Sequence, residues 1–232
     1  MSKRTELILF DIDGTLLQQR GVVQHGIAQA LQEVFGKTGP IESYVMSGKT
    51  DPQIMRELMA LASISDAEIE EKLLSAQQAY VRALSASIHK FNVQASVGVI
   101  KLLDLLQEEG NLTLGLLTGN LIGVVKPKLD AAGISEEIFS LGAYGSDNPD
   151  RNQLPKIAIE RAEKLLNKEI APASVLIIGD TPRDIACARN GGTRVISVAT
   201  GQYSIEELEK HHPDYVFEDL SDIHKVLMAI GL

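Results

Sequence analysis

The sequence contains one cysteine, no long apolar run and a deficit of basic residues. The single cysteine, Cys187, excludes an intrachain disulfide and gives no support for a redox function. The residues before Leu7 form no apolar segment of a secretory signal, and Leu7–Phe10 is too short to supply one. No run approaches the length of a membrane span, so we expect no membrane partner. The predicted location is the cytoplasm.

The charge balance and the apolar content narrow the class of protein further. Acidic residues outnumber basic ones by 31 to 22, which gives a formal charge of −9. A negative field repels phosphate backbones and disfavours nucleic acid as a partner. Apolar residues make up 44% of the chain, as in globular proteins with a sizeable core. The 232 residues fit one large domain or a domain that carries an insertion.

Short apolar runs that alternate with helical patterns predict a parallel sheet covered by helices. A wholly apolar run is typical of a strand buried on both faces. The runs are Leu7–Phe10, Leu112–Leu117, Val175–Ile178 and Val195–Val198, with a weaker one at Tyr215–Phe217. The helical patterns between the runs are Val99–Glu109, Ile157–Leu166 and Pro182–Arg189. This alternation predicts an α/β fold with a doubly wound, Rossmann-like parallel sheet.

The stretch from residue 18 to residue 92 breaks this alternation and predicts an inserted all-helical cap subdomain. Its helical segments are Val23–Phe35, Asp51–Leu61 and Ser65–His89, the last opening with the form of a capping box. A block of about 75 residues is too long to be a connection between a strand and a helix. We expect residues 1–17 and 93–232 to form the core. The cap would then lie at the carboxyl end of the first strand, where open sheets bind ligands.

Polar side chains follow three of the predicted strands. They are Asp11 and Asp13 after the first, Thr118, Gly119 and Asn120 after the second, and Asp180 and Asp184 after the third. Paired carboxylates repel each other unless a cation lies between them, and oxygen ligands suit Mg²⁺. The loop at Thr118 combines a hydroxyl with a helix N-terminus, which favours phosphate binding. Taken alone, this loop and the one at Asp180 also fit helix caps, and the one at Asp11 also fits a solvated turn.

Other site types are absent from the sequence. A calcium loop beginning at Asp11 would need Gly and Glu where Leu16 and Val22 stand. The chain has no glycine-rich P-loop, no G-x-S-x-G elbow and no zinc-type cluster of Cys and His. The remaining interpretation is an oxygen-rich cation site beside an anion pocket.

The motifs Asp11-Ile12-Asp13-Gly14-Thr15, Leu117-Thr118-Gly119-Asn120 and Gly179-Asp180-Thr181-x-x-Asp184 resemble those of the haloacid dehalogenase-like hydrolases, in order and spacing. The resemblance is to the branch with a helical cap. The segment Gly48-Lys49-Thr50-Asp51 is similar to the cap loop of phosphoglycolate phosphatase-like members. One departure is Val97-Gly98, where relatives often have Pro-Gly at the entry to the helix after the cap.

The resemblance implies Mg²⁺-dependent hydrolysis of a small phosphomonoester through an aspartyl-phosphate. Asp11 would be the nucleophile, and Asp13 the general acid and base. The metal ligands would be Asp11, Asp180 and the carbonyl of Asp13, with Asp184 completing or orienting the set. Thr118, Gly119 and Asn120 would hold the phosphoryl oxygens. The remaining residues expected to contact the substrate are Gly14, Thr15, Lys49, Thr50 and Asp51.

The family also carries a cation between the second and last motifs, usually in a Lys-Pro-x-Pro segment that this chain lacks. We favour Arg151 for this role over Lys156, because guanidinium binds phosphate through two parallel hydrogen bonds. Lys126 and Lys128, in the preceding helix, are expected to be solvated.

Several alternatives stay open from the sequence. They are a phosphomutase, a phosphonatase with a Schiff-base lysine from the cap, and a non-catalytic binding protein. Asp13 argues against C–halogen cleavage, because the founding dehalogenases lack an acid at this position. The small phosphorylated metabolite that serves as substrate is not identified, and both a monomer and a homodimer remain possible.

Overall fold

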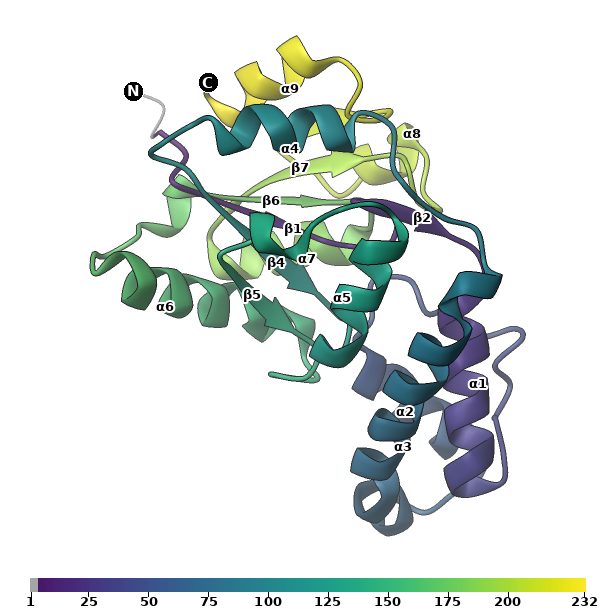
Figure 1. Cartoon of the computed structure of the whole chain (residues 1–232). Helices are drawn as coiled ribbons and strands as arrows, with labels where there is room; N and C mark the ends of the chain where they lie inside the picture. The colour runs from purple at the N-terminus through teal and green to yellow at the C-terminus, as the bar shows by residue number, and fades with distance from the viewer. Residues whose placement is uncertain (1–3) are drawn as a thin grey trace.

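A computed structural model describes residues 4–232 and contains a six-stranded sheet in the order β5-β4-β1-β6-β7-β8 (Figure 1). Every pairing in this sheet is parallel. The strands are β1 (Leu7–Phe10), β4 (Thr113–Thr118), β5 (Leu141–Tyr144), β6 (Val175–Gly179), β7 (Arg194–Val198) and β8 (Tyr215–Phe217). The predicted α/β fold with a doubly wound sheet is confirmed.

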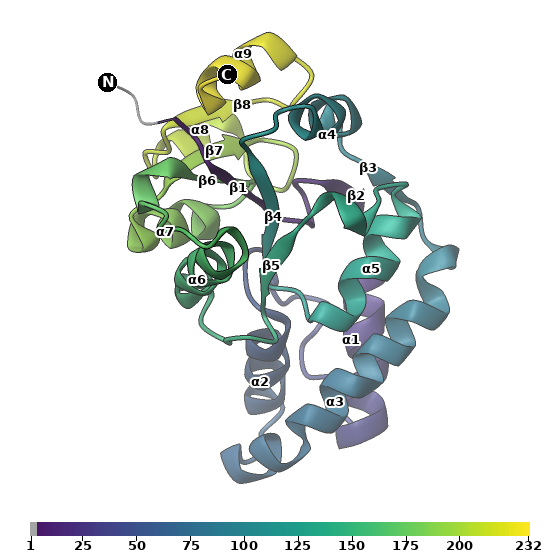
Figure 2. The ribbon, with the colours of Figure 1, turned by 60° about the vertical axis from the view of Figure 1, so that its left-hand side comes forward.

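Helices cover both faces of this sheet, which explains why its central strands are apolar throughout. Figure 2 shows α4 and α5 on one side of the sheet and α6 and α7 on the other. The first face carries α4 (Val99–Gln107), α5 (Ile122–Ala131) and α9 (Ile223–Ile230). The second carries α6 (Leu154–Leu166), α7 (Pro182–Gly191) and α8 (Ile205–Glu209). Alternate residues of β1 enter the two cores, Ile8 and Phe10 on one side and Leu7 and Leu9 on the other.

Between β1 and β4 the chain contains an insertion of three helices, which lies at the lower right of Figure 1. They are α1 (Val22–Phe35), α2 (Asp51–Leu61) and α3 (Asp66–Ser87), and we call residues 22–90 the helical insertion. The insertion has its own apolar core, which also takes in Leu121 and Val124 from the start of α5. Ser65 caps α3 as predicted and accepts a hydrogen bond from the Glu68 N–H, but Glu68 itself pairs with Lys72.

Some elements were not predicted. The two chain segments that join the insertion to the sheet form an antiparallel ribbon of β2 (Leu17–Gln19) and β3 (Val93–Ala95). Strand β5 and helix α9 were also missed. Short 3₁₀ turns complete the chain at Ile88–Lys90, Glu136–Ile138, Arg151–Gln153 and Pro172–Ser174. Among residues 4–232, each helix is too short or too polar to cross a membrane.

Tyr80 of α3 offers a test of the packing in the insertion. Its side chain is fully buried, and its hydroxyl has no hydrogen-bond partner among the described residues. A buried hydroxyl without a partner costs free energy, so Tyr80→Phe should raise the free energy of unfolding by about 1 kcal/mol. Chemical denaturation measures this value. The control is Tyr215→Phe at a 47% exposed position, which should change little. A loss of stability in Tyr80→Phe would contradict the prediction.

Candidate functional site

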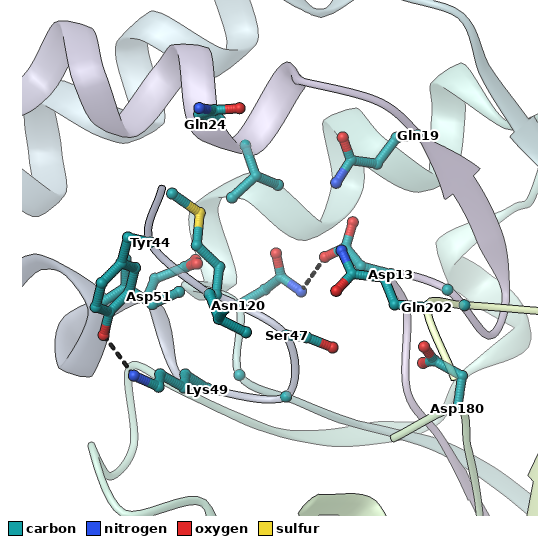
Figure 3. Close-up of a pocket in the computed structure, with 18 of the residues that line it drawn as sticks. Asp13, Gln19, Gln24, Tyr44, Ser47, Lys49, Asp51, Asn120, Asp180 and Gln202 are labelled. Atoms are coloured by element: carbon teal, nitrogen blue, oxygen red, sulfur yellow. Dashed lines mark hydrogen bonds between the residues drawn. The ribbon is translucent and has the colours of Figure 1, made fainter. Parts of the chain in front are cut away.

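Three loops meet at the carboxyl edge of the sheet because the strands that precede them are neighbours. Strand β1 pairs with β4 on one side and with β6 on the other, all parallel. Asp11 follows β1, Thr118 ends β4, and Asp180 follows β6. The structure therefore brings together the three polar motifs that the sequence placed after buried strands. Figure 3 shows Asp13, Asn120 and Asp180 around the resulting pocket.

Asp11, Asp180 and Asp184 form a buried group of carboxylates. One oxygen from each lies within 4.8 Å of the others. Arg151 Nη2 lies 2.5 Å from Asp184 Oδ1 and 3.1 Å from Asp11 Oδ1, and its side chain is 7% exposed. One guanidinium against three carboxylates leaves two negative charges when all are ionised. A divalent cation would balance them.

The pKa values of two of these carboxyls are raised, chiefly by burial. Burial raises the pKa of Asp11 to about 6, against the opposing effect of Arg151. Burial, together with the charges of Asp184 and Asp11, raises the pKa of Asp180 well above its usual range. Such shifts are typical of functional sites, and a bound cation would reverse them.

The backbone around Asp180 leaves room for its carboxylate at two glycines. A Cβ at Gly14 would lie 2.3 Å from Asp180 Oδ2, and one at Gly201 would lie 1.7 Å from the same atom. Gly14 also has a φ of +87°, which other residues rarely adopt. The Thr15 hydroxyl donates to Asp180 Oδ1 at 3.1 Å. Asp180 is therefore closely enclosed by backbone and by Thr15, and its carboxylate offers the oxygen donors that a hard divalent cation prefers.

Asp184 is more constrained than Asp180. Its Oδ2 accepts hydrogen bonds from the Thr181 N–H at 3.0 Å and the Thr181 hydroxyl at 2.6 Å, in a capping box at the start of α7. Its Oδ1 is paired with Arg151. Since both oxygens are engaged, this geometry favours an orienting role for Asp184 over direct metal ligation.

The two cations considered from the sequence lie in different environments. Arg151 enters the site from a 3₁₀ turn, and its carbonyl accepts a hydrogen bond from Cys187 Sγ of α7 at 3.2 Å. Lys156 stands in the first turn of α6 with its side chain 78% exposed, 4.0 Å from Glu160. The structure brings Arg151 to the carboxylates and leaves Lys156 in solvent, because that face of α6 points away from the sheet.

The expectation that Lys128 is solvated is wrong. Its side chain is fully buried, and its Nζ lies 2.6 Å from Asp13 Oδ2 and donates a hydrogen bond to Asn120 Oδ1. Asn120 Nδ2 donates to Asp13 Oδ2 at 2.8 Å and to the Thr118 hydroxyl at 2.7 Å. Only Lys126 behaves as predicted, with a 63% exposed side chain paired with Asp130.

The position of Lys128 in its helix could have predicted that its side chain is buried. In a helix, residues three and four apart along the chain share one face. Val124, Val125 and Leu129 are buried in α5, so Lys128 stands on the apolar face of that helix. A lysine at such a position is buried only when it has a polar partner.

The segment at the start of α2 contacts the loop that follows β4. The Asp51 N–H donates to the Gly119 carbonyl at 2.8 Å, and Asp51 Oδ2 accepts from the Leu121 N–H at 2.8 Å. The Thr50 hydroxyl donates to the Pro149 carbonyl at 2.8 Å. Burial raises the pKa of Asp51 to about 7, although Lys128 favours its charged form. Thr50 and Asp51 therefore hold the insertion against the core.

Lys49 points toward its own subdomain, as Figure 3 shows. Its Nζ lies 2.6 Å from Glu57 Oε2 and 2.6 Å from the Tyr44 hydroxyl, which itself donates to Glu57. The backbone of Lys49, by contrast, approaches the core closely, since a Cβ at Gly119 would lie 2.2 Å from the Lys49 carbonyl oxygen.

A cavity of about 670 Å³ lies between the helical insertion and the sheet edge. Asp11, Asp13, Thr118, Gly119, Arg151 and Asp180 line its core side. Most of the cavity wall on the insertion side is neutral and includes Gln24, Ser43 and Met46. A small molecule fits this volume.

Comparison with known proteins gives a family match over most of the chain. The family model described as haloacid dehalogenase-like hydrolase matches residues 8–198. The pyrophosphatase PpaX of Bacillus velezensis is 25% identical over 224 residues, which cover 95% of each chain. The phosphoglycolate phosphatase of Escherichia coli is 31% identical over 127 residues, which are 55% of this chain and 47% of that protein.

Solved structures share the fold of the whole chain. A hydrolase from Pseudomonas syringae superposes with a TM-score of 0.72 at 22% identity, covering 97% of this chain and 98% of its own. CbbY from Rhodobacter sphaeroides in complex with phosphate gives a TM-score of 0.67 at 17% identity, covering 98% of this chain and all of its own.

The charge balance of the carboxylates predicts a stabilising effect of divalent cations. Ligand at 100 times its Kd stabilises a folded protein by about 2.7 kcal/mol, so a divalent cation should raise the Tm clearly. Asp180→Asn should raise the Tm of the metal-free protein, because it relieves repulsion, and should abolish the shift with metal. Thermal unfolding with and without cation measures both effects. Glu160→Gln, at an exposed acid of α6, is the control and should keep the full shift. A cation shift that persists in Asp180→Asn would place the ion elsewhere.

Proposed function

The chain belongs to the haloacid dehalogenase-like hydrolases and is a phosphatase of that family, and on this premise we propose that it hydrolyses a small phosphomonoester through an aspartyl-phosphate at Asp11 with Mg²⁺ as cofactor. The observation that carries the proposal is the buried group of Asp11, Asp180 and Asp184 with Arg151, placed beside the Thr118 loop. Nucleophile, cation ligands and an anion-binding loop then share one edge of the sheet.

The residues present fit a magnesium site, since every ligand is an oxygen and the surplus charge is negative. Asp11, Asp180 and the main-chain carbonyl of Asp13 would hold the ion. Bound Mg²⁺ would supply positive charge that lets an anionic carboxylate approach an anionic phosphate.

The reaction has two displacements at phosphorus. In the first, an oxygen of Asp11 bonds to phosphorus while the ester P–O bond breaks, and Asp13 gives its proton to the departing alkoxide. In the second, Asp13 takes a proton from water, whose oxygen bonds to phosphorus as the bond to Asp11 breaks. Inorganic phosphate leaves and Asp11 is regenerated.

The remaining groups act on the charge of the phosphoryl group. The Thr118 hydroxyl and the N–H groups of Gly119 and Asn120 would hold its oxygens, as the position of this loop at the start of α5 favours. Arg151, held in place by Asp184, would neutralise the pair formed by Asp11 and phosphate. Uncatalysed cleavage of phosphate monoesters is so slow that enzymes accelerate it by up to ~10²¹-fold. One residue cannot supply such an acceleration, so several of these groups must act together.

Residues 18–92, which contain the helical insertion, would serve as the cap that shields the reaction from water and contacts the leaving group. Its contact with the Thr118 loop through Asp51 supports this role. The names of the relatives supply two substrates to test, inorganic pyrophosphate and phosphoglycolate. Turnover of p-nitrophenyl phosphate with and without Mg²⁺ tests the activity itself, and a panel of small phosphate esters then identifies the preferred leaving group.

Asp11→Asn should lower kcat by more than about 1,000-fold, because the amide is not a competent nucleophile. The fold should persist, since the change removes one of several mutually repelling charges. Release of phosphate from p-nitrophenyl phosphate measures kcat, and circular dichroism checks the fold. Asp130→Asn, with the same charge change at a 53% exposed side chain, is the control. Retention of more than about a tenth of the wild-type kcat would refute the nucleophile assignment.

Arg151→Ala and Lys156→Ala form a matched pair of variants. Removal of a group that stabilises transition-state charge costs about 100-fold or more, so Arg151→Ala should lose that much in kcat/KM. Lys156→Ala should stay close to wild type because its side chain is in solvent. Assays well below the Tm separate this loss from the instability expected when a buried ion pair is broken. A hundredfold loss in Lys156→Ala with little loss in Arg151→Ala would reverse the two assignments.

A further inference from the structure

We propose that Lys128 is a positioning residue for Asp13, fixing the acid through a buried ion pair and linking its placement to the seating of the helical insertion. The inference rests on the proposed function, in which Asp13 protonates the leaving group. It concerns a lysine outside the three motifs, in the middle of α5.

The contacts of Lys128 account for one oxygen of Asp13. Asp13 Oδ2 accepts hydrogen bonds from Lys128 Nζ at 2.6 Å and from Asn120 Nδ2 at 2.8 Å. Lysine has donors only, so its contact with Asn120 Oδ1 fixes which end of the amide faces Asp13. Two donors on Oδ2 restrict rotation of the carboxyl group. They leave Oδ1 as the oxygen that accepts no hydrogen bond within residues 4–232.

The burial of Lys128 indicates that this arrangement has a function beyond packing. Its side chain is fully buried on a face of α5 that is otherwise apolar. A buried charge is costly to desolvate, and an apolar residue of similar volume often stabilises such a site as well or better. Both hydrogen-bond partners of the ammonium, Asp13 and Asn120, line the catalytic cavity. The polar contacts of Lys128 therefore position residues of the cavity and do not stabilise the apolar core.

A second acid connects Lys128 to the helical insertion. Asp51 is buried at the start of α2, and the charge of Lys128 acts on it. Asp51 also bonds to the backbone of Gly119 and Leu121, which flank Asn120. Lys128 thus holds the side chain of Asn120, while Asp51 holds the backbone on either side of it. Seating of the insertion on this loop and placement of Asp13 then depend on the same group of contacts.

The experiment compares two esters of similar shape, p-nitrophenyl phosphate and phenyl phosphate. The first has a good leaving group that needs little help from an acid, and the second a poor one. Lys128→Met should lose tenfold or less in kcat on p-nitrophenyl phosphate. On phenyl phosphate it should lose about 100-fold, which is the cost of a misplaced catalytic group. Asp13→Asn should also lose more kcat on phenyl phosphate than on p-nitrophenyl phosphate, by a larger ratio. We call this difference the leaving-group preference. Lys126→Met, two residues along the same helix with an exposed side chain, is the control and should match wild type.

Equal losses on both esters would overturn the proposal, because they would indicate a general structural defect. Loss on neither ester would overturn it as well. If Lys128→Met does not fold, Lys128→Gln replaces it in the test, because glutamine keeps a hydrogen-bond donor without the charge. Lys128→Gln should show the same leaving-group preference, with a smaller ratio between the losses of kcat on the two esters. Absence of the preference in Lys128→Gln would then overturn the proposal.

Thermal unfolding separates this proposal from the proposed function. If the wild-type protein hydrolyses neither ester, the proposed function fails, and the ion pair is tested on its own. Lys128→Met should lower the Tm of the wild-type protein by more than it lowers the Tm of Asp13→Asn, because the second background has already lost the ion pair. Equal decreases in the two backgrounds would show that Lys128 does not hold Asp13.

Discussion

Mutual repulsion among carboxylates at the sheet edge constrains the rest of the site. Asp11, Asp51, Asp180 and Asp184 are buried there, and Asp13 is partly buried beside them. Within residues 4–232, the ion pairs that reach these carboxylates come from Arg151 and Lys128 alone. Two cations do not balance five acids when all are ionised. This surplus of negative charge suits the site to a divalent cation, and it would hinder the approach of a phosphate without one.

The two compensating cations reach the site from opposite faces of the sheet. Lys128 belongs to α5, which packs on the face that also carries α4 and α9. Arg151 comes from the turn before α6, on the other face, where α7 holds its backbone through Cys187. Each cation therefore meets a different carboxylate of the first loop, Arg151 at Asp11 and Lys128 at Asp13. The alternation of side chains along an extended strand does not by itself separate these two acids, which are two residues apart. Separation comes from the turn at Gly14 and from these distinct partners.

The parts of the site that could be predicted are those defined by strand ends. Asp11, Thr118 and Asp180 each follow a wholly apolar run, and parallel strands bring their carboxyl ends together whatever the details of packing. Strand β5 was missed because Gly142 interrupts its short apolar run, and the ribbon of β2 and β3 because pairing of two partly exposed segments leaves little trace in composition. Lys128 was missed because residue type was given more weight than its place on the apolar face of α5. Arg151 could be ranked above Lys156 from the sequence, but only the course of the backbone separates a buried turn from an exposed helical face.

The insertion is joined to the core by more than its two connecting strands. Its apolar core includes Val124 of α5, the helix that also carries Lys128, and Leu121, which immediately precedes that helix. Asp51 binds the same loop through its N–H and its carboxylate. A movement of the insertion away from the sheet would have to break these polar contacts or carry the loop after β4 with it. Since that loop contains Asn120, which holds Asp13, the geometry of the acid and the position of the insertion are not independent variables. In this fold the helical insertion is therefore also placed to influence the position of Asp13.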